Sequence, residues 1–564
     1  MRITGKRKSL EPCTESGWEA YDILTDAPLS EEDIFGLKHI DGSFLFLRNL
    51  KKPFFKIENH QYIIKGAAGD SFFRVAAHRD SLGILESTFG GIGMENRNKE
   101  LQEEQKTMKK RAMDEKLVVR PIVGCLTHSH FWEGPCRAGR AEDMTKEAEN
   151  AAADRYLAQM KETLKGVTKE AQLMDVVDAR YDESFVVPEE IYAQIEEDME
   201  KADIFLCMGW RIPKLERYKK PVVIMQNGNE GIDFAAYCRS IGVEAYVAMD
   251  LQDLNEILHY LWVRKAVACT RVLCLSAAAQ PTFGIQSLIR DPEVLRQRYG
   301  LEVIKLPFYD IFKYMDQITD EEAKPIADKI IGGSGDTKVN TEWFINDIRY
   351  YLAAKKMMDR YQCNAFTTAC HELCTSEIPQ NRKFTPCMAH SLLKGEGIPS
   401  GCEEDLNALM AMCVLQYLGN RPCFMGNPNH ETDELLRIHH AVPALCMNGY
   451  GTKPLNYKLW AFTGQGFGGK LQIDFTENDQ DKVTLGRFNP AGDTMIVKTG
   501  QVLRTEYDEV YCSPYYFIQM DDARTFMHDL AGFGHHQVLV FGDYAKQVKE
   551  LSRYMHFQVL ESGK

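Results

Sequence analysis

From residue 117 onward the sequence alternates short apolar runs with helical stretches, and no other feature constrains the fold of the chain as strongly. In residues 117–268 the apolar runs are LVVRPIVGCLTH, QLMDVVDAR, DIFLCMGW, PVVIMQN and VEAYVAMD. The stretches between them, such as residues 141–164 and 188–201, are predicted to be helical. Strands that are apolar along their whole length indicate a parallel sheet covered by helices on both faces. We therefore predict a Rossmann-like α/β domain over residues 117–268.

A second pass of the same kind begins at residue 269. It contains TRVLCLSAAAQPTFG and LEVIKLPFYDIF, a helical segment over residues 341–360, and YQCNAFTTACHELC. A second Rossmann-like α/β domain is therefore predicted over residues 269–425. After about residue 426 the chain is richer in turns and strand-like runs, such as KLQIDFTEND, KVTLGRFNPAGDTMIVKTG and HHQVLVFGDY. This pattern predicts an antiparallel, β-rich domain over residues 426–564.

The N-terminal part of the chain follows a different pattern. Residues 1–95 contain the strand-like runs GSFLFLRNL, FFKIEN, QYIIKG and SFFRVAAH, separated by Gly, Asn and Lys, and predict a small α+β extension. Residues 96–116 are almost wholly polar and charged, with strong helix formers, and predict an exposed helical linker. The expected fold class is therefore α/β, with two parallel-sheet domains, a β-rich C-terminal domain and an N-terminal extension.

Charge and composition disfavour several classes of protein. The formal net charge of −14 argues against general nucleic-acid binding. No run of about 18 apolar residues occurs, so no membrane span is expected. The N-terminus, MRITGKRKSLEPCTES, has no apolar core and is not expected to be a secretory signal. The 16 cysteines are scattered through apolar contexts without a CxxC pair, which indicates reduced thiols and a cytoplasmic location.

Three acids stand directly before an apolar helix in IPSGCEEDLNALMAMCVLQYLGNRPCFMGNP. From Leu406 to Leu418 the apolar residues recur at helical spacing, with a face wide enough to be buried. The acids are Glu403, Glu404 and Asp405. Acids in this position often only interact with the first helical turn, whose N–H groups are unpaired and carry partial positive charge. A chemical role requires partners from elsewhere in the chain.

Three other stretches supply such partners. TTACHEL carries Glu372, RIHHAVP carries His439 and His440, and GFGHHQVLVFGD carries His535 and His536. Carboxylates and imidazoles together suit a divalent transition metal such as Mn²⁺ or Co²⁺. They also suit proton transfer, because both groups act as general acids and bases. A histidine pair on its own is more often structural than catalytic.

Taken together, the stretches from residue 270 to the C-terminus resemble the L-fucose isomerase and L-arabinose isomerase superfamily. The most specific part is PCMAHSLLKGEGIPSGCEEDLNALMAMCVLQYLGNRPCFMGNP, which is similar to the family's GIP(A/V)xCExDxxxAL core, its helix and its GxPxF turn. VTLGRFNPAGDTMIVKTGQV is similar to the GxxTLxR segment of the family, and FGHH to its GNHH or GGAHH signature. The N-terminal extension resembles nothing in these isomerases.

The resemblance implies a Mn²⁺ ion, or another divalent transition metal, held by two carboxylates and one or two histidines. Glu372 corresponds to the first acid of the family. Arabinose isomerases use the acid that corresponds to Glu403, and fucose isomerases use the one that corresponds to Asp405, so both are candidate ligands here. The late histidine of the family corresponds to His535 or His536.

Candidate substrate-binding residues come from two stretches. His439 stands where the family has a histidine before a short turn, and His440 stands where many relatives have cysteine. In THSHFWEG, residues His128, His130 and Trp132 follow the first predicted strand of the α/β region, where open sheets bind ligands. A tryptophan can stack on a sugar ring while imidazoles donate hydrogen bonds. The same stretch also suits a turn with polar caps.

The resemblance implies a metal-dependent aldose–ketose isomerase that acts on a small sugar through an enediol. Glu372, Asp405 and Glu403 would be its acid–base groups, and Glu404 is expected to face solvent or to cap the helix. A homo-oligomer of three or more chains, with sites near subunit interfaces, is also implied. The alternative is a sugar- or glycoside-binding or regulatory paralogue that kept the fold and lost the reaction, since one fold often hosts several functions.

Overall fold

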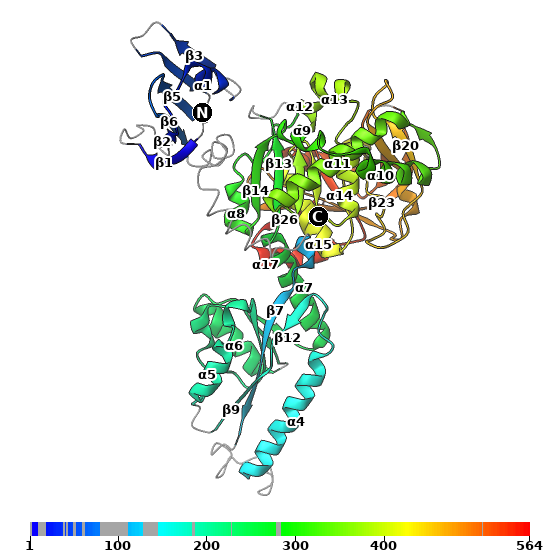
Figure 1. Ribbon diagram of the computed structural model, residues 1–564. Coiled ribbons are helices and arrows are strands. Elements are labelled where there is room, and N and C mark those ends of the chain that lie inside the picture. Colours follow the sequence, from blue (N-terminus) through cyan, green and yellow to red (C-terminus); the bar gives the residue numbers. More distant parts are fainter. Residues whose placement is uncertain are drawn as a thin grey trace.

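The chain is mixed α/β, with two parallel sheets and antiparallel β-rich regions (Figure 1). This computed structural model describes residues 3–9, 18–37, 40, 43–48, 52–58, 62–78, 111–127, 145–182, 186–226, 228–277, 284–509 and 511–563. Within these ranges no helix combines the length and the apolar character that crossing a membrane would require. The predicted substrate contacts His128, His130 and Trp132 lie outside the described residues.

Six antiparallel strands form the N-terminal sheet, in the order β1-β2-β6-β5-β4-β3. The strands are β1 (Ile3–Lys8), β2 (Trp18–Thr25), β3 (Ser43–Leu47), β4 (Phe54–Glu58), β5 (Tyr62–Ala67) and β6 (Phe72–His78), and the helix α1 (Glu31–Gly36) follows β2. Strands β3 to β6 confirm the four runs predicted for this region. Strands β1 and β2 were not predicted, and the sequence of β1, ITGKRK, is too polar to stand out. The predicted charged linker is described only from Arg111 onward, where a single 3-10 turn (Ala112–Asp114) precedes the next strand.

The first parallel sheet has the order β12-β11-β10-β7-β8, with β9 also paired to β7. Its strands are β7 (Leu117–Leu126), β8 (Ala171–Leu173), β9 (Val177–Tyr181), β10 (Ile204–Gly209), β11 (Val222–Met225) and β12 (Ala245–Ala248). The helices of this unit are α4 (Lys146–Leu164), α5 (Glu189–Glu196), α6 (Asn229–Ser240) and α7 (Leu251–Ala268). Neighbouring residues such as Phe205 and Leu206 belong to two different core clusters. Both faces of the sheet are therefore covered, as the continuous apolar runs predicted.

The second parallel sheet has the order β14-β13-β16-β17. Its strands are β13 (Arg271–Ser276), β14 (Glu302–Pro307), β16 (Ala365–Thr368) and β17 (Ser400–Cys402). The accompanying helices are α8 (Glu293–Tyr299), α9 (Asp310–Met315), α10 (Asp320–Gly333), α11 (Thr341–Tyr361), α12 (Cys370–Thr375), α13 (Glu377–Arg382) and α14 (Cys387–Gly395). Helix α11 confirms the helix predicted over residues 341–360. Thr368 pairs with Cys402, so the segments that follow β16 and β17 leave the sheet at the same edge.

Six antiparallel strands close into a barrel in the C-terminal region. The ring runs β22-β25-β18-β19-β24-β23, and β23 pairs back with β22. Its strands are β18 (Phe424–Thr432), β19 (Leu435–His439), β22 (Val483–Phe488), β23 (Thr494–Glu506), β24 (Tyr515–Gln519) and β25 (Gln537–Phe541). Strand β26 (Gln558–Glu561) adds to β23, and a small sheet holds β15 (Thr337–Lys338), β20 (Tyr457–Ala461) and β21 (Gly469–Ile473). Helices α16 (Ala523–Asp529) and α17 (Ala545–Met555) complete this region.

Helix α15 (Leu406–Gly419) lies between the second parallel sheet and the barrel. It contacts β17 of that sheet, β22 and β25 of the barrel, and helix α7. Every residue from Leu406 to Leu418 is buried, so the helix is covered on all sides rather than on one face. The predicted start of this helix at Leu406 is confirmed, and Asp405 is its N-cap residue.

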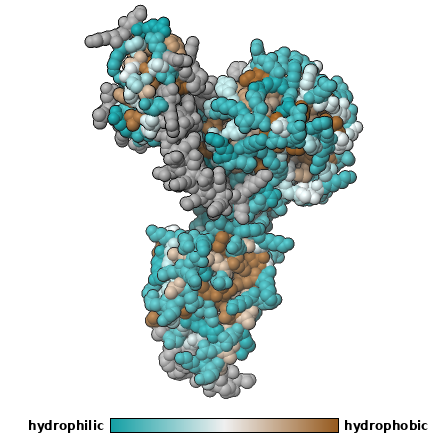
Figure 2. Space-filling view, in the orientation of Figure 1, coloured by the Kyte–Doolittle hydropathy of each residue, from teal (hydrophilic) through white to brown (hydrophobic). Residues whose placement is uncertain are grey.

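The face of the molecule shown in Figure 2 is mostly hydrophilic, with an apolar area over the unit built on the first parallel sheet. The exposed large hydrophobic residues of this unit include Val186, Ile232, Tyr237, Ile241 and Met249. Apolar surface of this kind is often covered by another protein surface.

Candidate metal centre

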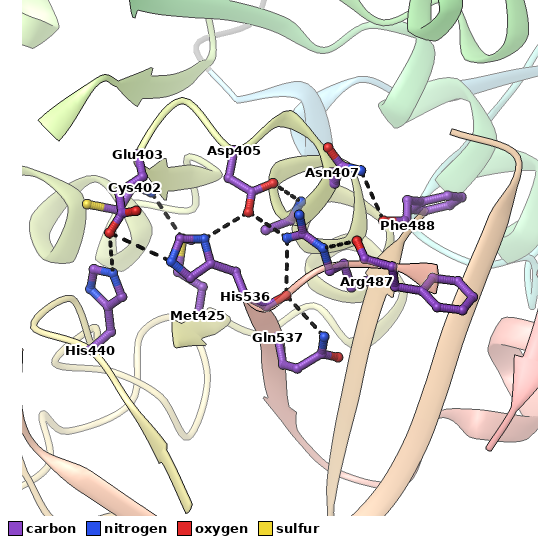
Figure 3. Close-up of polar contacts among 12 residues, drawn as sticks. Cys402, Glu403, Asp405, Asn407, Met425, His440, Arg487, Phe488, His536 and Gln537 are labelled. Carbon is purple, nitrogen blue, oxygen red and sulfur yellow. Dashed lines mark hydrogen bonds and ion pairs between the residues drawn. The ribbon is translucent and has the colours of Figure 1, made fainter. Parts of the chain in front are cut away.

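Three segments that are distant in sequence bring Glu403, His440 and His536 together (Figure 3). Glu403 follows β17, His440 follows β19, and His536 precedes β25. Glu403 Oε1 lies 3.6 Å from His440 Nε2 and 3.8 Å from His536 Nε2. Within the described ranges, these residues form the one group of at least three His, Cys, Asp or Glu side chains whose ligand atoms all lie within 4.8 Å of one another.

The backbone of the acid loop is unusual. Glu403 and Glu404 have φ angles of 60° and 57°, in the left-handed region that non-glycine residues adopt at a cost of roughly 1–2 kcal/mol each. The expectation that Glu404 faces solvent or caps the helix is wrong. Its side chain is 2% exposed and accepts hydrogen bonds from Ser276 Oγ at 2.7 Å and from Lys305 Nζ at 2.8 Å. The loop therefore directs its two glutamates to different partners.

Asp405 forms a buried ion pair with Arg487, and both side chains are 0% exposed. Asp405 Oδ2 accepts from Arg487 Nη1 at 2.5 Å and from His536 Nδ1 at 2.8 Å, while Oδ1 accepts from the Ala408 N–H at 3.0 Å. Burial alone would raise the pKa of Asp405, but the Arg487 guanidinium and His536 hold it well below its usual range. Asp405 is thus ionised and orients His536 rather than lying among the three grouped ligands.

The contact between His536 and Asp405 sets which nitrogen of a neutral His536 ring is unprotonated. An ionised carboxylate can only accept, so the short contact with Asp405 places the proton of a neutral His536 ring on Nδ1. Its Nε2 is then unprotonated, and a histidine held by a carboxylate in this way is a common arrangement at metal sites. Gly534, two residues earlier, has φ +104°, and a Cβ there would lie 2.9 Å from Arg487 Nη2. A glycine is therefore required for the turn that brings His536 to Asp405.

His440 presents the opposite tautomer. Its Nδ1 accepts from the Ala441 N–H at 3.0 Å, so a neutral ring carries its proton on Nε2, the atom nearest Glu403. Burial lowers the pKa of His440 to about 4, although the interaction with Glu403 acts in the other direction. Burial would raise the pKa of Glu403, but His536 and His440 lower it to about 2. At neutral pH Glu403 is therefore a carboxylate and His440 is a neutral imidazole.

These residues fit a divalent transition metal. The Nε2 atoms of His440 and His536 are buried and have no hydrogen-bond partner in the described structure, which is uncommon for buried polar atoms. Separations of 3.6 and 3.8 Å are those of neighbouring ligands around an ion bound at about 2.0–2.2 Å. A carboxylate with imidazole suits a transition metal better than Mg²⁺ or Ca²⁺. His536 is already in the tautomer that binds metal, whereas His440 is set to donate a proton.

The other predicted site residues lie outside this group. Glu372 is partly exposed on α12, the helix that follows β16. His439 Nδ1 contacts the Cys512 carbonyl oxygen at 3.0 Å, and burial lowers the pKa of His439. His535 is exposed beside His536, with its ring centroid 4.4 Å from that of His536. A Cβ added at Gly284 would lie 3.2 Å from Glu403 Oε2 and 3.1 Å from His371 Cβ, so the segment before Glu372 lies close to Glu403.

Two residues of the site were missed in the sequence analysis. Arg487 belongs to the VTLGRF run, in which nothing local indicates a partner for the arginine. Lys305 interrupts the apolar run LEVIKLPF, and a lysine inside a predicted buried strand was a readable signal that a buried partner exists.

No protein-family model matches the chain, and no curated protein matches it significantly. The resemblance to sugar isomerases therefore stays a prediction that rests on the residues quoted for it.

Proposed function

We propose that the chain is a metal-dependent aldose–ketose isomerase, an intramolecular oxidoreductase similar to the L-fucose and L-arabinose isomerases. The group of Glu403, His440 and His536 is the observation that carries the proposal, together with the two buried Nε2 atoms, which make no hydrogen bond within the described residues. All three residues are among those singled out in the sequence for metal or substrate binding. Glu403 follows β17 at the carboxyl edge of the second parallel sheet, which is where open α/β folds bind ligands.

The proposal includes a division into domains. We assign Rossmann-like domains to residues 117–268 and 269–425, a β-rich domain to residues 426–564 and a small α+β extension to residues 1–95. The two parallel sheets, the closed barrel and the N-terminal antiparallel sheet support this division. The metal group would then lie where the second and third domains meet.

We assign Glu403 and His536 to hold the ion, which we take to be Mn²⁺ or a similar transition metal. When bound, it would supply the positive charge that polarises the sugar carbonyl. Asp405 keeps the proton of His536 on Nδ1, so that Nε2 stays free to bind. His440 carries its proton on Nε2 and would donate it in a hydrogen bond to a sugar oxygen.

Isomerisation moves a proton from C2 to C1 of the sugar and a hydroxyl proton from O2 to O1. We assign the carbon-bound proton to Glu372, because its helix follows the strand paired with β17 and its side chain is partly exposed. Asp405 is 0% exposed and already accepts three hydrogen bonds, so we assign it a positioning role rather than proton transfer.

A screen of aldoses and ketoses with Mn²⁺ tests the proposal, with the products separated by chromatography. One aldose–ketose pair is expected to interconvert, and Glu372→Gln is expected to lower turnover by at least about a hundredfold without changing the fold. Glu377→Gln, on the neighbouring helix α13, is the control and should retain full turnover. A chain that binds one equivalent of Mn²⁺ but converts no sugar would contradict the isomerase.

A sugar- or glycoside-binding or regulatory paralogue without isomerase activity is the second candidate. Asp405 is committed to Arg487 and His536, and Glu372 is not among the grouped ligands, so fewer carboxylates surround the group than the resemblance implies. Equilibrium binding of a sugar that is never converted would favour this function.

We further propose a homo-oligomer of three or more chains, with sites near the subunit interfaces and a small sugar as the substrate. The exposed apolar side chains of the unit with the first parallel sheet, such as Ile232 and Tyr237, support an interface there. The cysteines that the structure describes are free, which supports a reducing, cytoplasmic location.

A further inference from the structure

Lys305, on β14, makes an ion pair that the proposed chemistry does not use. Its Nζ lies 2.8 Å from Glu404 Oε1, and the two side chains are 25% and 2% exposed. Ser276, the last residue of β13, donates to the same oxygen at 2.7 Å. Burying two charges is unfavourable unless their mutual interaction and further hydrogen bonds compensate for the lost hydration. A pair at this place therefore needs a structural reason.

The backbone next to the pair supplies that reason. Glu403 and Glu404 are consecutive non-glycine residues with φ angles of 60° and 57°. Such conformations persist only where the surroundings hold them. The Glu404 N–H donates to the Thr368 carbonyl oxygen at 3.0 Å, and its side chain is held by Ser276 and Lys305. Glu404 is thereby fixed to three strands of the second parallel sheet, and Glu403 is left facing the histidines.

We propose that Lys305 is a positioning residue of the metal centre. Its ion pair with Glu404 holds the acid loop in the left-handed conformation and so keeps Glu403 Oε1 opposite His440 and His536. The role rests on the proposed function, because Lys305 acts through the ligand Glu403 rather than on the substrate. It also explains why the loop carries Glu404, rather than glycine, at a position of positive φ.

Lys305→Met tests the role, with Arg271→Met as the matched control. Arg271 pairs with Glu302 at 3.6 Å, and this pair joins the starts of β13 and β14, away from Ser276 and Lys305. The measurements are Mn²⁺ affinity by calorimetry and crystal structures of the metal-free proteins. Lys305→Met is expected to bind Mn²⁺ about 10- to 100-fold more weakly, which is the usual loss when a residue that supports a metal ligand is replaced. The 3.6 Å separation of Glu403 and His440 is expected to lengthen. The control should change neither quantity.

The double variant Lys305→Met with Glu404→Gln distinguishes a specific effect on the metal centre from a general loss of folding. The single variant leaves a buried carboxylate without its cation, whereas the double variant removes both charges. We expect the double variant to fold and to show the same weakening. Wild-type affinity together with an unmoved Glu403 in either variant would overturn the role of Lys305. Wild-type protein that binds no Mn²⁺ would instead refute the proposed function, and the metal-free structures would still decide whether Lys305 positions Glu403.

Discussion

Replacing Asp405 by Asn removes a negative charge from a place where both carboxylate oxygens are in use. One oxygen accepts from the Ala408 N–H, and the other accepts from Arg487 and from His536. Asparagine offers one acceptor oxygen and one NH₂ donor group. In either orientation of the amide, the NH₂ group faces at least one of these donors. Arg487, which is 0% exposed, also loses its carboxylate partner.

The expected loss of stability is large. Breaking a buried ion pair by removing one partner costs about 3–5 kcal/mol. Since about 1.36 kcal/mol is a factor of ten, the opening equilibrium of α15 should rise by roughly a hundredfold to a few thousandfold. The helix cap itself is not the cause, because asparagine is as good an N-cap residue as aspartate.

Hydrogen–deuterium exchange with mass spectrometry is the suitable assay, read on a peptide that covers α15. A chain of several structural units need not unfold in one step, and local exchange does not require that it does. Asp433→Asn is the control, because Asp433 and its partner Arg524 are 65% and 60% exposed and such pairs contribute about 1 kcal/mol or less. If the amide exchange rates of α15 in Asp405→Asn stay within about tenfold of the wild-type rates, this account of the buried pair is refuted.

Burial lowers the pKa of His440 from 6.5 to about 4. The contribution of His440 to the free energy of unfolding should therefore be complete above pH 6.5 and fall by up to about 3 kcal/mol toward pH 4, because mainly the unfolded chain binds the proton. The unfolding midpoint of His440→Gln should vary less with pH over this range than that of the wild type. An equal pH dependence of the two midpoints would contradict the assignment. His536→Gln should weaken Mn²⁺ binding by more than about a hundredfold and His440→Gln by less than about tenfold, because, when both rings are neutral, only His536 has its Nε2 lone pair free. Equal losses of affinity in calorimetry would show that both rings are ligands. Chelation should abolish isomerase activity, with Mn²⁺ restoring it better than Mg²⁺, and full activity without metal would refute metal dependence. Light scattering should show three or more chains per particle, and a monomer would rule out a shared site.

The parallel sheets were predictable because their strands are short, continuous apolar runs separated by helical stretches. The closure of the barrel was not predictable, because it depends on which antiparallel strands pair over long distances in the sequence. β22 pairs both with the nearby β23 and with the distant β25, and no local pattern distinguishes these partners. Strand β17 was missed for another reason, because its three residues are too few to show a periodicity.

The three grouped residues were among the candidates in the sequence, but the sequence did not predict that these three would lie together. Glu403, His440 and His536 were all candidates, yet the sequence does not show which hydrogen bond each ring makes. Asp405 and Arg487 are 82 residues apart, and only the fold shows that this arginine occupies the carboxylate. A carboxylate that binds a metal and one that orients a histidine look alike in a sequence. They differ only in the partners that their oxygens have in the folded protein.

Asp405 both caps helix α15 and orients a candidate metal ligand. One of its oxygens caps α15 by accepting from Ala408, and the other orients His536. The partial positive charge at the start of a fully buried helix helps Asp405 to stay ionised, and an ionised Asp405 keeps the proton of His536 on Nδ1. The cap therefore sets the tautomer of the candidate ligand. The tautomer of His536 depends on the negative charge of Asp405. A neutral residue that caps the helix equally well therefore cannot replace Asp405.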